Sequence, residues 1–207
     1  MIGASKLAMA AAMYGVISTS SAAVTRAEPS ASRAPSAKDA SHSTHSTHGA
    51  AKIPEALAVP EGNRLAFEYD AQGVQIYRCS EVAGGGPAWA LEAPEAELRT
   101  KNGHVAGTHF KGPAWKASDG STVVGAKLQA ANGDATAVPW LLLQATSHEG
   151  AGRMSKVSFI QRLHTRGGLA PTSGCDAAHS GQTVRVPYSA RYAFYEPMSG
   201  NSTPVAP

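Results

Sequence analysis

The feature that most constrains this fold is an alternation of apolar and polar residues with a period of two, interrupted by short turn sequences. In residues 64–70, for example, three apolar side chains alternate with polar ones, which is typical of a half-buried strand. The pairs Asn102-Gly103 and Asp119-Gly120 favour the positive φ angles that tight hairpins need. No window keeps a helical period. We therefore expect an all-β fold: a single antiparallel β-sandwich or flattened barrel with at most one or two short helices.

The expected strands cover residues 64–70, 73–82, a segment around Trp89, 96–101, 104–110, 113–118, 121–130, 140–148, 156–166, 183–188 and 191–195. Residues 140–143 (WLLL) are apolar without alternation, which predicts a strand covered on both faces. In the run that follows, we expect Val157, Phe159 and Leu163 to face the core. The only short helices that the pattern allows are at 93–98 and at 176–179.

The chain divides into four segments by composition. Residues 1–27 have a basic residue, an apolar run of eleven residues at 7–17 and then small residues, the pattern of a signal peptide cleaved between residues 22 and 27. Residues 28–52 and 198–207 have few large apolar residues and are expected to be a disordered linker and tail. The β domain is expected at 53–197. No later run is long and apolar enough to span a membrane, so we expect a secreted or periplasmic protein.

The net charge of +3 and the isoelectric point of about 8.9 do not describe this domain. Five of the 18 Lys and Arg residues precede Ile53, which leaves 13 in residues 53–197 against 13 Asp and Glu. The domain is formally neutral, and this argues against nucleic acid as a partner.

Two cysteines, Cys79 and Cys175, lie far apart in a chain that carries an export signal. Export favours a disulfide between them. The alternative is two buried free thiols.

Four sequence blocks resemble a known family of exported bacterial and fungal proteins catalogued as a domain of unknown function. They are GVQIYRC, GTHFKGPAWKASDGSTVVG, PWLLLQATSHEG and SFIQRLHTRGGLAPTSGCDAAHSGQTVRVPYSARYAFY, between about Val59 and Tyr195. The resemblance implies a secreted domain with paired cysteines and no established activity. Some fungal relatives are labelled malate dehydrogenase. The sequence does not support that label, because it has no GxGxxG turn between a strand and a helix.

The first candidate site is a metal or acid–base cluster of His109, His148, Asp176 and His179. Asp176 and His179 are three residues apart, so one helical turn would place both on one side. Imidazoles and a carboxylate suit zinc, copper or iron. In the alternative interpretation, Asp176 only caps a short helix that positions Cys175.

The second candidate site is the face of the 156–166 run opposite to its apolar residues. On a pleated strand Arg162, His164 and Arg166 project together, and such a face suits an anionic ligand. The alternative is a solvated strand face with paired charges. Trp115 follows Gly112-Pro113 and is expected in a loop, where its ring could stack on a sugar.

The sequence favours an exported non-enzymatic binding or envelope-associated module for an anionic or carbohydrate ligand. The alternative is a metal-binding protein or metal-dependent enzyme that uses the His/Asp cluster. We predict no cofactor for the binding module, whereas the alternative requires a divalent metal. A serine hydrolase is disfavoured because the chain has no G-x-S-x-G sequence.

Overall fold

The computed structural model describes residues 52–198. The expected signal peptide and almost all of the expected linker and tail lie outside the described residues. The elements are η1 (Glu55–Leu57), β1 (Asn63–Val82), β2 (Gly86–Arg99), β3 (Val105–Phe110), β4 (Ala114–Ala117), β5 (Thr122–Ala131), β6 (Trp140–Glu149), β7 (Phe159–Gly167), η2 (Ala177–His179) and β8 (Thr183–Pro197). The prediction of an all-β fold with at most two short helices is confirmed.

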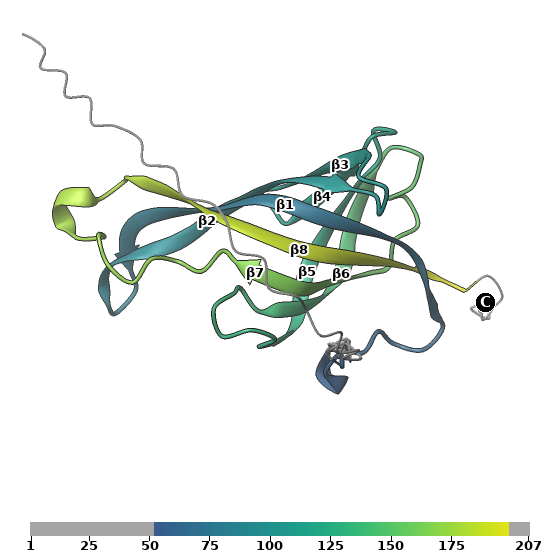
Figure 1. The fold of residues 1–207 in the computed structure, drawn as a ribbon, viewed down its shortest axis with the longest axis horizontal. Helices are drawn as coiled ribbons and strands as arrows, with labels where there is room; N and C mark the ends of the chain where they lie inside the picture. Colours follow the sequence, from purple (N-terminus) through teal and green to yellow (C-terminus); the bar gives the residue numbers. More distant parts are fainter. Residues whose placement is uncertain (1–51, 199–207) are drawn as a thin grey trace, which may run out of the picture. The chain divides into compact units, whose positions relative to one another are not determined.

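The eight strands form one closed barrel (Figure 1). Each strand pairs antiparallel with the next, and β8 returns to pair with β1. The ladder between β1 and β8 runs from Asn63 opposite Pro197 to Arg78 opposite Thr183. Of the two architectures expected, the chain therefore adopts the barrel.

Three pairs of expected strands are each one long strand, and one of them is β2, which joins the segment around Trp89 to the strand expected at 96–101. Residues 64–70 and 73–82 are joined in β1, which has 20 residues. Gly73 lies at the junction, and a Cβ atom there would collide with the Glu95 carbonyl and Ala96 of β2. Residues 183–188 and 191–195 are likewise joined in β8. Glycine thus lets β2 approach β1 closely where the alternation alone suggested a break.

The hairpin predictions are confirmed at the two Gly-containing pairs. β2 and β3 are joined through Gly103, and β4 and β5 through Gly120, with φ angles of 80° and 89°. These turns lie at the same end of the barrel as the β6–β7 connection. We call this end the closed end. The other end carries the β1–β2, β3–β4, β5–β6 and β7–β8 connections, and we call it the open end.

Aromatic side chains fill the barrel at its closed end. Phe67 stacks on Phe194 with ring centroids 4.8 Å apart, and Tyr69 meets Phe194 edge-on at 5.8 Å. Met154 and Val157, from the β6–β7 connection, are fully buried in the same cluster.

A second apolar cluster lies outside the barrel. Leu57 of η1 packs with Trp140, Leu142 and Leu163 on the outer surface of β6 and β7. The Gln161 side-chain amide fixes this segment by donating a hydrogen bond of 2.6 Å to the Leu57 carbonyl. The WLLL strand is therefore covered on both faces, as predicted.

This outer cover reverses the expected orientation of β7. Phe159 and Leu163 belong to the outer cluster, whereas Ile160 belongs to the interior cluster and Arg162 lines the interior cavity described below. The expectation that Phe159 and Leu163 face the barrel core is wrong. The outward face of β7 is apolar because η1 covers it, whereas the inward face carries Arg162, so the apolar residues indicated the wrong side.

Neither helical turn within residues 52–198 has the length and hydropathy needed to cross a membrane.

Candidate functional site: a cavity at the open end of the barrel

The open end of the barrel is hollow. A cavity of about 540 Å³ extends inward from the loops at this end. Its walls are largely apolar and include Leu91, Pro94, Val138, Leu141, Leu143 and Leu169. The interior of an eight-stranded barrel is just wide enough either to be filled by side chains or to hold one small ligand. This barrel is filled at one end and hollow at the other.

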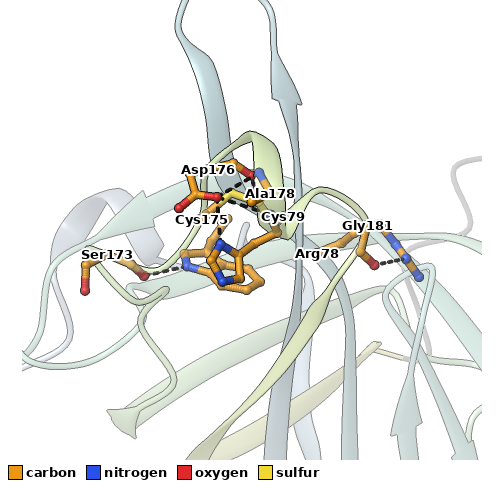
Figure 2. The surroundings of a disulfide bond; sticks show 9 residues. Arg78, Cys79, Ser173, Cys175, Asp176, Ala178 and Gly181 are labelled. Atoms are coloured by element: carbon orange, nitrogen blue, oxygen red, sulfur yellow. Dashed lines mark hydrogen bonds and ion pairs between the residues drawn. A yellow bond between two sulfur atoms is a disulfide. The ribbon is translucent and has the colours of Figure 1, made fainter.

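The segment between β7 and β8, residues 168–182, begins at the cavity, where Leu169 and Ala170 are part of the lining, and we call it the strap. A disulfide joins Cys175 of the strap to Cys79 of β1, with Cα atoms 5.3 Å apart and a sequence separation of 96 (Figure 2). The disulfide prediction is confirmed. Trp89 Nε1 donates a hydrogen bond of 2.8 Å to the Ser173 carbonyl. The strap is thus fixed to β1 and β2, and its Leu169 lines the cavity.

The start of the strap requires glycine. Gly168 has a φ angle of 79°, and a Cβ atom on it would lie 2.8 Å from Tyr188 Cβ and 3.1 Å from Gln75 Cγ. The Gly168 carbonyl accepts a hydrogen bond of 2.5 Å from the Tyr77 hydroxyl. The strap therefore leaves β7 in close contact with the cavity wall.

The Asp176–His179 pair has a structural role in the strap. The Asp176 carboxylate accepts hydrogen bonds from the backbone of Ala178 at 2.9 Å and His179 at 3.2 Å, so it caps η2 next to the disulfide (Figure 2). His179 Nδ1 also contacts this carboxylate at 2.6 Å. The hydrogen bond from His179 is the main cause that lowers the pKa of Asp176. This is the capping arrangement of the alternative interpretation.

The four residues of the expected metal cluster are not brought together. His148 Nε2 lies 2.8 Å from the Val157 carbonyl, near the closed end. His109 is buried in the barrel wall, and Asp176 and His179 lie in the strap. Within residues 52–198, no group of three or more His, Cys, Asp or Glu side chains could hold a metal ion.

The expected basic face of β7 is divided by a bulge. The register of β7 against β8 shifts between Leu163 and Arg166, and His164 has a φ angle of 51°. His164 and Arg166 are exposed and line an outer hollow of about 410 Å³, whereas Arg162 lines the interior cavity. The expectation that the three side chains project together does not hold, because an irregular backbone interrupts the two-residue period.

Arg162 brings an uncompensated positive charge to the cavity. Its Nε and Nη2 atoms donate hydrogen bonds of 3.1 Å and 2.9 Å to the Pro139 carbonyl. No carboxylate within residues 52–198 forms an ion pair with it. Glu92, the acidic residue of the cavity lining, pairs with Arg78 at 2.9 Å instead.

His109 and Trp115 form one wall of the cavity. Their rings stack with centroids 4.5 Å apart, and both side chains are almost fully buried. Trp115 lies in β4 and not in the loop expected from Gly112-Pro113. His109 Nδ1 is 2.9 Å from the Ala114 carbonyl, which can only accept, so Nδ1 carries the proton. Burial, opposed by the hydrogen bond to Ala114 and aided by the nearby Arg162 charge, lowers the pKa of His109 to about 3, so the ring is neutral near pH 7.

Three buried groups of the cavity lining have unpaired hydrogen-bond donors. They are Gln75 Nε2, Trp115 Nε1 and the Tyr192 hydroxyl, on side chains that are 1%, 1% and 0% exposed. None of the three atoms has a hydrogen-bond partner among the described residues. Burial raises the pKa of Tyr192, although the neighbouring Arg162 and Tyr188 side chains oppose this, so the hydroxyl stays protonated. Buried polar groups are nearly always paired in folded proteins, so three orphans in one lining indicate a missing partner.

Sequence reasoning missed Gln75 and did not single out Tyr192 from the other tyrosines. A signal for Gln75 was present in GVQIYRC, because its side chain shares the inward phase of β1 with Tyr77 and Cys79. A polar residue at an inward position of a strand is itself unusual.

The fold and the cavity define a class of protein: a closed, eight-stranded antiparallel barrel with a hollow end of ligand size. The model of the family described as "Protein of unknown function (DUF3455)" matches residues 60–196. The chain belongs to this family, which confirms the resemblance seen in its motifs. No curated protein and no solved structure matches the chain.

Proposed function

We propose that this protein is an exported, non-enzymatic binding module that holds a small anionic molecule in the open end of its barrel. The observation that carries the proposal is the unpaired cation of Arg162 in a largely apolar cavity. Arg162 is partly buried, and a charge withdrawn from water is costly unless it is compensated. The described residues provide no carboxylate for this one. A bound anion would supply the compensation.

The size and composition of the cavity support the same proposal. Its volume of about 540 Å³ lies within the range of roughly 300–1,000 Å³ that is usual for small-molecule sites. Such sites combine apolar walls with a few placed polar groups, as this one does. A polymer such as a cell-envelope glycan would instead need an extended open groove.

Binding is favoured over catalysis by the chemistry of the lining. The lining contains no Ser, Thr or Cys, the usual nucleophiles of acyl transfer. Its histidine has a pKa of about 3, far below the value near the working pH that suits a general base.

Export is supported by the disulfide, because such bonds persist in oxidising compartments. The predicted signal peptide would deliver the chain there. Cell fractionation and N-terminal sequencing of the mature protein test this part. We expect the protein outside the cytoplasm, with a first residue between 23 and 28, and a cytoplasmic protein with an intact N-terminus would contradict it.

The cavity is tested with an anionic apolar dye, anilinonaphthalene sulfonate, and two variants of the same strand. Ala130 lines the cavity mouth, whereas Ala126 is exposed on β5 and does not line it. We expect one dye molecule per wild-type chain, unchanged binding in Ala126→Trp and at least tenfold weaker binding in Ala130→Trp. No dye binding to the wild type, or equal binding to both variants, would overturn the proposal.

A further inference from the structure

We infer that the ligand class is an amphipathic monocarboxylate, with its carboxylate at Arg162 and its apolar body directed toward the mouth. This inference rests on the proposed function, and it identifies the chemical group that the polar part of the lining binds. We call this part, which includes Gln75, His109, Trp115, Arg162 and Tyr192, the inner wall.

The unpaired groups of the cavity lining are hydrogen-bond donors. The unpaired atoms Gln75 Nε2 and Trp115 Nε1 can only donate, and the Tyr192 hydroxyl can donate as well. The missing partner must therefore be an acceptor. A neutral alcohol or amide would bring donors of its own into a site rich in donors, whereas an ionised carboxylate only accepts.

The positive charge of Arg162 sets the charge of the ligand. Arg162 is the cation of the inner wall, since Lys127 is exposed at the mouth and His109 is neutral. One guanidinium balances one negative charge, so a monoanion fits better than a dianion such as a phosphate monoester. The guanidinium also matches the planar shape of a carboxylate. Its link to Pro139 uses Nε and Nη2 and leaves Nη1 for the ligand.

The apolar part of the lining indicates what the rest of the ligand is made of. From Arg162 outward, the lining is made largely of Leu, Ala, Val and Pro side chains. At the mouth, Leu91 and Leu169 are 56% and 43% exposed. Apolar surface left in water at the entrance of an apolar cavity favours a ligand with an apolar body, because burying both gains about 25 cal/mol per Å². A sugar acid would leave its hydroxyl groups without partners there.

The test uses four ligands that share one chain: decanoate, its methyl ester, decanol and decylamine. With the disulfide-intact protein, isothermal titration at pH 7 should give an affinity for decanoate at least tenfold higher than for the other three. Arg162→Gln should weaken decanoate binding by tenfold or more and leave decanol binding unchanged. Arg162→Lys, which keeps the charge but loses the planar fork, should give an intermediate affinity.

The outcomes separate the ligand class from the function. If the dye binds but decanoate binds no better than its ester or decanol, the carboxylate assignment is wrong and the binding module stands. Tighter binding of decylamine would also overturn the assignment. If neither the dye nor any of the four ligands binds, the proposed function itself fails. The comparison of acid with ester uses only the wild-type protein, so it decides the question even if Arg162→Gln does not fold.

Discussion

The two ends of the barrel satisfy their buried polar groups very differently. At the closed end, the fully buried Ser121 hydroxyl donates a hydrogen bond of 2.5 Å to Asp119 and accepts one of 3.0 Å from the Met154 backbone. At the open end, Gln75 and Tyr192 are just as buried but have unpaired side-chain donors. An unsatisfied buried donor costs about 1–3 kcal/mol. Near the closed end, Thr100 Oγ1 is also unpaired among the described residues, but three unpaired donors belong to the lining of one cavity at the open end, and this concentration distinguishes the two ends.

The largest loss of stability is expected from Phe194→Ala, which removes a side chain that fills the closed end. Phe194 is fully buried at the closed end and contacts three aromatic rings within 6.1 Å, those of Phe67, Tyr69 and Trp115. Its truncation should lower the free energy of unfolding by about 3–5 kcal/mol, measured by urea denaturation. Phe194→Leu, which refills much of the space, is the control and should cost less. A loss below about 1 kcal/mol from Phe194→Ala would contradict a filled closed end.

A change of pH is expected to have an intermediate effect on the free energy of unfolding, because His109 titrates at different pH values in the folded and unfolded states. The unfolded chain binds a proton at His109 near pH 6.5, whereas in the fold burial lowers this pKa to about 3. Between these values the unfolded state binds more protons, so stability is full above pH 6.5 and falls as the pH is lowered toward 3. Going from pH 7 to pH 5 should cost about 2 kcal/mol from this group.

The matched variant for the pH series is His109→Phe, which keeps an aromatic ring against Trp115 but cannot titrate. It should be less stable at pH 7, because the Ala114 carbonyl loses its donor. Between pH 7 and pH 5, however, its denaturation midpoint should change much less than that of the wild type. Parallel curves for the two proteins would show that His109 is not held neutral.

The smallest effect on stability is expected from Tyr192→Phe. This residue lies two positions before Phe194 on the same face of β8, but its hydroxyl has no partner in residues 52–198. Removing an unpaired hydroxyl should leave the free energy of unfolding unchanged or raise it by up to about 1 kcal/mol. Decanoate affinity should fall severalfold in the same variant. A stability loss above about 1 kcal/mol would show that the hydroxyl is paired without a ligand.

Local patterns in the sequence predicted the local structure well. The Asn102-Gly103 and Asp119-Gly120 turns, the strand WLLL covered on both faces and the disulfide all occur in the fold. The turns and the WLLL strand depend on residues that are close in sequence, and the disulfide was predicted from the oxidising compartment that an export signal implies.

The cavity could not be predicted in the same way. Its inner wall combines Gln75 of β1, His109 of β3, Arg162 of β7 and Tyr192 of β8, so it exists only once the barrel closes. The bulge at His164 separates Arg162, which lines the cavity, from His164 and Arg166, which stay on the outer surface. The cover by η1 also explains why the outward face of β7 is apolar, a feature that the sequence alone assigned to the interior.

The pairing of β1 with β8 makes the barrel a ring with no distinct first strand. Because Asn63 lies opposite Pro197, the points where the polypeptide enters and leaves the ring are neighbours at the closed end. Joining them and opening the chain at Gly85, in the β1–β2 turn, would give a circularly permuted barrel with the same cavity. For the same reason, a fluorescent reporter or a surface tether can be fused at either of these two points without obstructing the mouth.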